Sequence, residues 1–109
     1  METTARFAVP RDSEYYGPDV DQETAGKLAD RIADIIREIA AVEMPNITVI
    51  VDTVQERVSY PNHPYIDIGD ERFHAEDIGP GRDEAGSLLD QMESIENAAW
   101  QRALDEMFS

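Results

Sequence analysis

The sequence predicts an α+β fold in which two long helices pack on one face of a small, mainly antiparallel sheet of three or four strands. Two segments, residues 20–43 and 84–107, carry apolar side chains at steps of three and four, the pattern of an amphipathic helix. Short runs rich in β-branched residues lie between them, bounded by proline and glycine as strands are. The expected order is therefore α-β-β-β-α, with room for a fourth strand before the last helix.

We expect residues 1–18 to form an N-terminal arm outside a single domain of residues 19–109, because they mix turn formers with aromatic side chains. A short strand at residues 6–9 is one option within this arm. Its aromatic residues, Tyr15 and Tyr16 among them, either pack on the core or contact a partner protein.

The first helix is expected to begin at Asp19, whose carboxylate can accept hydrogen bonds from the free N–H groups of the first turn. Gln22, three residues later, completes a capping-box pattern. The apolar stripe of this helix runs from Ala25 to Ile39. Pro45 ends the helix, because the residue before a proline avoids the α conformation.

The segment between the helices carries the strands. Residues 47–53 are apolar on both faces and rich in β-branched side chains, which favours a central strand covered on at least one side. The chain then either turns near residues 52–54 or continues as one long bent strand, and a loop with two prolines follows at residues 61–64. The run at residues 65–68 meets Gly69, whose place at the first turn position favours a type II′ hairpin with residues 71–75.

The second helix is expected to begin at Asp83 or at Ser87. Its apolar stripe follows the helical period and consists of Leu88, Met92, Ile95, Ala99, Ala103 and Met107. Trp100 and Phe108 widen the stripe. Each of these two either joins the core or, if it stays exposed, anchors a homodimer or a partner, because aromatic side chains dominate the energetics of interfaces.

The composition excludes several classes of function. With 24 acidic and 9 basic residues the formal net charge is −15, and so negative a protein repels nucleic acid and anionic membranes. The absence of cysteine rules out a disulfide framework, a cysteine-type zinc site and a thiol nucleophile. No basic leader and no long apolar run occurs, so we expect a soluble, cytoplasmic protein.

No pattern of residues indicates catalysis or a bound cofactor. His63 and His74 lie in or beside the β region, but their spacing matches no zinc motif and no third ligand is marked. Asp67 lies between two isoleucines, and strand alternation turns it to the wet face of the sheet. The glycines around Pro80 lack the Lys-Ser/Thr ending of a phosphate loop, and acids follow them. We therefore expect a protein that is not an enzyme and holds neither metal nor cofactor.

The acidic excess is densest in the second half of the chain. Residues 67–109 hold twelve acids and three arginines, and no base lies between residues 83 and 96. Acids three or four residues apart on a helix are displaced by about 4.5–6 Å along its axis, on the scale of the ~3.4 Å axial spacing of phosphates along one DNA strand. The candidate partner-binding residues are Glu76, Asp77, Asp83, Glu84, Asp90, Glu93 and Glu96.

These features lead to the hypothesis of a small acidic inhibitor that mimics nucleic acid and occupies the basic, nucleic-acid-binding surface of a partner enzyme or effector. In size, charge and lack of a catalytic motif, the chain resembles the anti-restriction and anti-CRISPR proteins of phages and mobile elements. The alternative is a non-catalytic interaction or accessory protein whose acidity is salt adaptation. Lys27 is the only lysine, and surfaces rich in acid and poor in lysine are typical of salt-adapted organisms.

Overall fold

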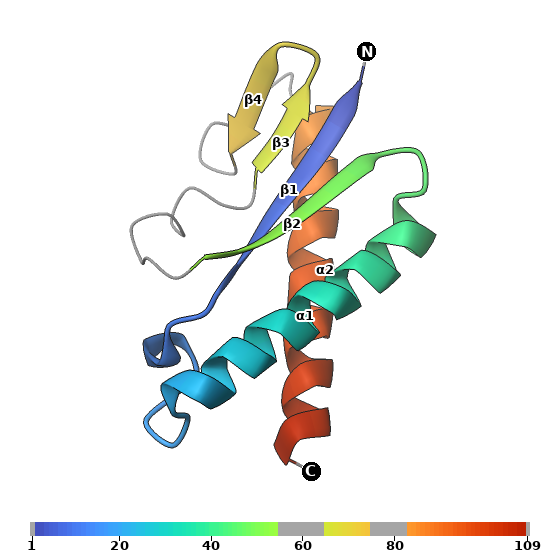
Figure 1. Ribbon diagram of the computed structural model, residues 1–109. Helices are drawn as coiled ribbons and strands as arrows, with labels where there is room; N and C mark the ends of the chain where they lie inside the picture. The colour runs from blue at the N-terminus through green and yellow to red at the C-terminus, as the bar shows by residue number, and fades with distance from the viewer. Residues whose placement is uncertain (1, 55–64, 75–82, 109) are drawn as a thin grey trace.

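The computed structural model of the protein describes residues 2–54, 65–74 and 83–108, and Figure 1 shows their arrangement. The elements follow the order β1 (Thr3–Pro10), η1 (Ser13–Tyr15), α1 (Gln22–Glu43), β2 (Thr48–Val54), β3 (Tyr65–Ile68), β4 (Glu71–His74) and α2 (Asp83–Phe108). The short element η1 is a single 3-10 turn. Within the described residues the fold is therefore α+β, as predicted, with two long helices and a four-stranded sheet.

The sheet is mixed, and its strand order is β2-β1-β3-β4. The prediction that residues 47–53 form a central strand is therefore wrong, because β2 lies at an edge of the described sheet and β1 takes an interior place. β1 pairs in parallel with β2, which places Phe7 opposite Val51. On its other side β1 pairs antiparallel with β3, which places Ala5 opposite Ile66. β3 and β4 form an antiparallel hairpin in which Ile66 lies opposite Phe73.

The predicted element order, which began with a helix, is wrong, because β1 precedes α1 and lies in the interior of the sheet. Ala5, Phe7 and Val9 of β1 are fully buried and alternate with residues that point to the other face. The segment that the sequence indicates as an arm thus contributes a complete strand. The parallel β1–β2 pair follows from this, since parallel strands need a long crossover connection and α1 supplies it.

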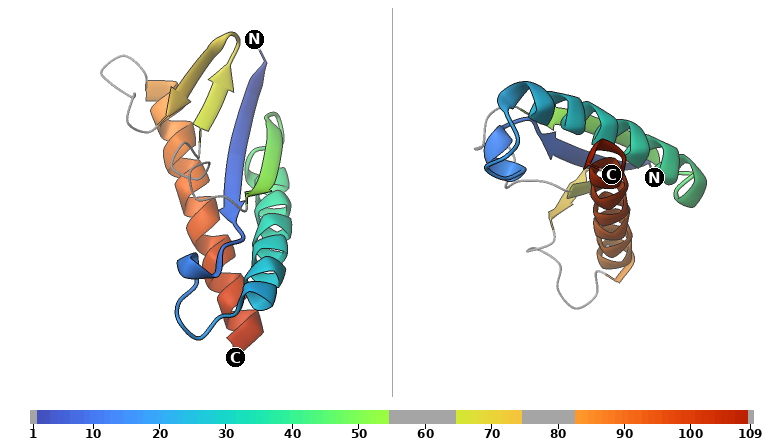
Figure 2. Two further views of the ribbon diagram at one scale, coloured as in Figure 1. Left: turned by 60° about the vertical axis from the view of Figure 1, so that its left-hand side comes forward. Right: turned by 90° about the horizontal axis from the view of Figure 1, so that it is seen from below.

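Both helices contribute to one hydrophobic core on the face of the sheet that carries Ala5, Phe7 and Val9. Figures 1 and 2 show α1 and α2 crossing each other as they pack with the sheet. The predicted apolar stripe of α1 is buried as expected, except for Ile39 at its end, which is partly buried. The largest fully buried helical side chains of this core are Leu28, Ile32, Ile35 and Ile36 of α1 and Met92 and Ile95 of α2.

The N-cap of α1 is Asp21, whose carboxylate accepts a hydrogen bond from the backbone N–H of Thr24 at 2.7 Å. The prediction that Asp19 caps this helix is therefore wrong. Val20 is 8% exposed and belongs to the core, so the chain enters the helix only after this residue has been buried. The helix ends at Glu43, and the next two residues are Met44 and Pro45, so the predicted stop is confirmed.

The hairpin between β3 and β4 turns at Gly69, which has a φ of +63°. No described residue other than glycine has a positive φ, so the turn needs the left-handed region at its first position alone, as a type II′ turn does. α2 begins at Asp83, the earlier of the two predicted starts. The predicted turn or bend beyond Val54 and the loop at residues 61–64 lie outside the described residues. Neither helix of the described chain is apolar enough over a sufficient length to cross a membrane.

Candidate functional site: the acidic surface of α2

Each positive side chain that the structure describes lies within ion-pair distance of an acid. On α1, Lys27 pairs with Glu23 at 3.6 Å, and Arg37 pairs with Asp34 at 3.0 Å. The other pairs join Arg31 to Glu106, Arg102 to Glu38 and Glu106, Arg11 to Asp30, and both Arg6 and Arg72 to Asp67. Exposed pairs of this kind add little stability, but they neutralise the acidic charge of α1 locally.

Two acids in the N-terminal half of α2 have no such compensation among the described residues. Asp90 and Glu93 are exposed, and neither forms an ion pair within the described chain. Asp83 and Glu84 form the first turn of the helix, where the positive end of the helix dipole favours acidic residues. Glu76 and Asp77 lie outside the described residues. We use the name α2 acidic surface for Asp90 and Glu93.

Glu96 differs from the other predicted contact residues of α2 in its position around the helix axis. Successive residues of an α-helix are rotated by about 100°, so a step of three turns a side chain about 60° back around the axis. Glu96 is therefore aligned with Leu89 and Ala103, seven residues away on either side, which are only 4% and 1% exposed. Glu96 itself is half-buried, and its Oε1 atom is buried without a hydrogen-bond partner.

Burial raises the pKa of the Glu96 carboxyl to about 7, because desolvation disfavours its charged form and the negative charge of Glu93 adds to the effect. Near neutral pH roughly half of these carboxyls carry a proton in the folded protein. Glu96 therefore supplies less negative charge to the surface of α2 than Asp90 and Glu93 do, and it lies where the helix packs on the core.

The two aromatic residues that widen the apolar stripe of α2, Trp100 and Phe108, have different surroundings. Trp100 is half-buried, and its ring stacks on Tyr16 with the centroids 4.8 Å apart and the planes 18° from parallel. Tyr16 is held in place by its hydroxyl, which donates a hydrogen bond to the carbonyl oxygen of Pro10. Phe108 is 58% exposed at the end of α2. Of the two, Phe108 is the one that stays available for a partner.

A polar cluster that sequence reasoning missed lies on the sheet face opposite the helices. The guanidinium of Arg72 lies 4.2 Å from the ring centroid of Tyr65, and its Nε donates a hydrogen bond to Asp67 at 2.9 Å. Asp67 does point away from the core, as strand alternation predicts. The contact could have been found from the sequence, because a two-residue turn at residues 69–70 places Asp67 directly opposite Arg72.

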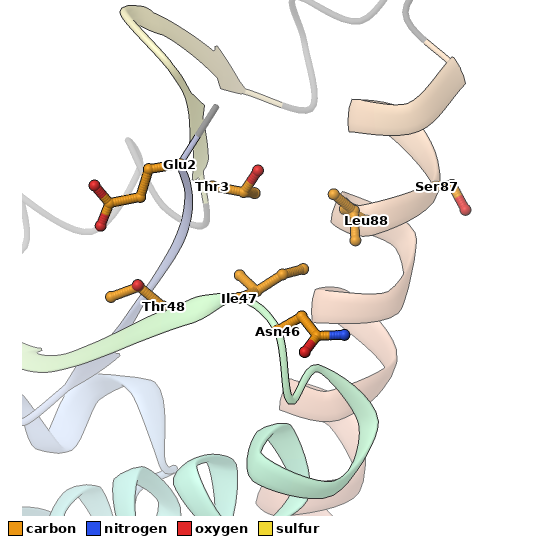
Figure 3. A pocket seen from close by; sticks show the side chains of 7 residues that line it. All are labelled: Glu2, Thr3, Asn46, Ile47, Thr48, Ser87 and Leu88. Carbon is orange, nitrogen blue, oxygen red and sulfur yellow. The ribbon is translucent and has the colours of Figure 1, made fainter.

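A pocket of about 370 Å³ lies between the first residues of β1 and β2 and the start of α2 (Figure 3). Ile47 and Leu88 reach into the gap between the strands and the helix, whereas the Glu2 carboxylate points away from α2 and the Ser87 hydroxyl points away from the strands. Its polar groups therefore do not converge on one point. Within the described chain no group of three or more histidine, aspartate or glutamate side chains could hold a metal ion, and His63 lies outside that part.

Comparison with protein-family models, with curated proteins and with solved structures found no match to this chain.

Proposed function

We propose that this protein is a small acidic inhibitor that occupies the basic, nucleic-acid-binding surface of a partner protein. The observation that carries this proposal is the uneven compensation of charge. The described bases are paired with acids, most of them on α1 or between α1 and α2, whereas Asp90 and Glu93 remain exposed and unpaired within the described chain. A helix is a rigid support, so these two charges keep a fixed spacing.

In this proposal the protein takes the part of the negatively charged DNA, and its partner supplies the positive charge. A groove lined with lysine and arginine attracts phosphates by their charge, and a protein of net charge −15 is attracted to the same groove. Such complementarity accelerates encounter and makes the affinity fall with added salt. A protein that acts in this way needs no catalytic residues and no cofactor.

The direct test is competition for a nucleic-acid-binding surface. A panel of purified restriction endonucleases and CRISPR effectors would be incubated with labelled DNA, and DNA binding measured by fluorescence anisotropy as this protein is added. We expect at least one panel member to release its DNA, with an inhibition constant that weakens as NaCl is raised. Inhibition of no member of the panel, or inhibition that is indifferent to salt, would contradict the proposal.

Two double variants with the same change in net charge test whether the α2 acidic surface is the part of the protein that contacts the partner. In the first, Asp90→Lys with Glu93→Lys, inhibition should weaken by about tenfold, because two attractive contacts become repulsive. The matched control is Asp52→Lys with Asp70→Lys, which reverses two exposed acids on β2 and in the β3–β4 turn. Equal losses in the two variants would show that total charge matters and that the α2 acidic surface is not the contact.

A second candidate function is that of an interaction or accessory protein whose acidity is salt adaptation. It is favoured by exposed acids that lie on the described surface away from α2. Glu2, Asp19, Asp52 and Asp70 are exposed on elements far apart in sequence, and Lys27 is the only lysine of the chain. Thermal unfolding in KCl from about 0.1 to 2 M separates the candidates, since screening strongly affects a self-repelling surface. A protein adapted to salt should unfold readily in the low range, whereas an inhibitor from a non-saline cell should stay folded there.

A further inference from the structure

A second surface lies at the opposite end of α2 from the α2 acidic surface. The segment that leads into α1 and the last turns of α2 enclose a pocket of about 440 Å³, lined by Tyr16, Asp19, Val20, Leu104, Asp105 and Phe108. Figures 1 and 2 show the C-terminal end of α2 beside the start of α1, so two segments far apart in sequence form the pocket together. Asp90 and Asp105 are 15 residues apart, which corresponds to roughly 22 Å along the helix.

The floor of this pocket is apolar and held in place. Tyr16 stacks on Trp100 and donates a hydrogen bond from its hydroxyl to Pro10, so its ring is fixed from two sides. Val20 is only 8% exposed beside it. A floor that is already ordered loses little conformational entropy when another side chain packs on it, and this favours binding.

The rim of the pocket combines exposed apolar surface with negative charge. Phe108 is 58% exposed, and it is one of the three large hydrophobic residues that the described chain leaves exposed. Asp19 and Asp105 also line the pocket, and both are exposed. The last turn of α2 contains no basic residue, so the negative end of the helix dipole adds to the charge of Asp105.

We propose that this pocket binds a short basic segment of a partner protein, in which one aromatic or aliphatic side chain inserts between Tyr16, Leu104 and Phe108 while flanking arginines or lysines pair with Asp19 and Asp105. Charge complementarity selects this occupant. A second copy of the chain would bring a net charge of −15 and the same acidic rim to the contact, so two copies repel each other there. The proposal is independent of the inhibitor function, because it uses other residues and requires an apolar side chain that inserts into the pocket.

Blocked pentapeptides test the proposal with the full chain. The probe has one phenylalanine between two pairs of arginines, the first control replaces this phenylalanine by glycine, and the second replaces the arginines by glutamates. We expect the probe to bind about tenfold more tightly than the glycine peptide, because an aromatic side chain is buried, and the glutamate peptide not to bind. Amide chemical shifts should change mainly at residues 16–20 and 104–108. Equal affinity for the first two peptides, or shift changes centred elsewhere, would overturn the proposal.

Surface variants keep the test independent of folding. Phe108→Ala should remove most of the tenfold preference for phenylalanine, and Asp105→Asn should weaken the probe by about threefold in a salt-dependent way. Their controls are Val42→Ala, at an 80% exposed apolar residue of α1, and Asp90→Asn, at an exposed acid of the same helix; neither should change binding. If Val42→Ala reduces the preference for phenylalanine as much as Phe108→Ala does, the proposal is overturned. It is also overturned if the free protein self-associates and Phe108→Ala abolishes that self-association.

Discussion

Glu96 allows a quantitative test of how α2 packs. Its carboxyl lies in the stripe of α2 that faces the core, with a pKa raised to about 7 from an ordinary value of 4.5. The folded protein therefore binds this proton more tightly than the unfolded chain, and the free energy of unfolding falls as the pH rises through the range from 4.5 to 7. The difference between the two pKa values corresponds to about 3 kcal/mol, an upper value because part of the residue is still in contact with solvent.

The substitution Glu96→Gln removes this pH dependence, because the amide has a similar shape and does not ionise. Relative to the parent protein, the variant should gain little at pH 5 and about 2–3 kcal/mol by pH 8, where the parent carboxyl is charged in both states. Urea unfolding at pH 5, 6, 7 and 8 measures the gain. The control Asp90→Asn removes the same single charge from an exposed position and should show no comparable trend. A gain from Glu96→Gln that is equal at pH 5 and pH 8 would refute the reasoning.

Two further substitutions test the parts of the fold that the sequence did not predict correctly. Phe7→Ala should lower the free energy of unfolding, measured in urea, by about 3–5 kcal/mol, because Phe7 is fully buried in β1. The control Phe108→Ala, at an exposed position, should change it by less than about 0.5 kcal/mol. Similar effects of the two substitutions would show that β1 is not part of the core. Asp21→Ala should lower the melting temperature by about 5 °C through loss of the helix cap, whereas Asp19→Ala should leave it nearly unchanged. Hydrogen bonds from Thr24 lower the pKa of Asp21, so the cap stabilises the fold above the ordinary pKa, and this contribution is lost as the pH falls through the lowered value. Calorimetry should therefore show a smaller difference between Asp21→Ala and its parent at pH 2.5 than at pH 7.

The candidate site could be predicted only in part. Sequence spacing finds the acids of α2 and the absence of a base between residues 83 and 96, and the structure leaves Asp90 and Glu93 exposed. Glu96 shows that counting acids along the sequence does not predict which of them are exposed. Its alignment with Leu89 and Ala103 follows from the helical repeat and was available in the sequence, but its half-buried state depends on what packs against that side of α2.

Local patterns determined both helices, the stop before Pro45 and the hairpin at Gly69, because each depends on residues within one or two turns of chain. Pairing partners are not local. β1 occupies the interior of the sheet because β2 pairs with its residues 4–10 on one side and β3 with its residues 3–6 on the other, and both partners come from more than 35 residues away. The sequence by itself therefore determined the helices and the net charge. Only the tertiary structure decided which strands lie in the interior of the sheet, which acids of the described chain remain unpaired and whether Trp100 or Phe108 stays exposed, since each of these depends on segments distant in sequence.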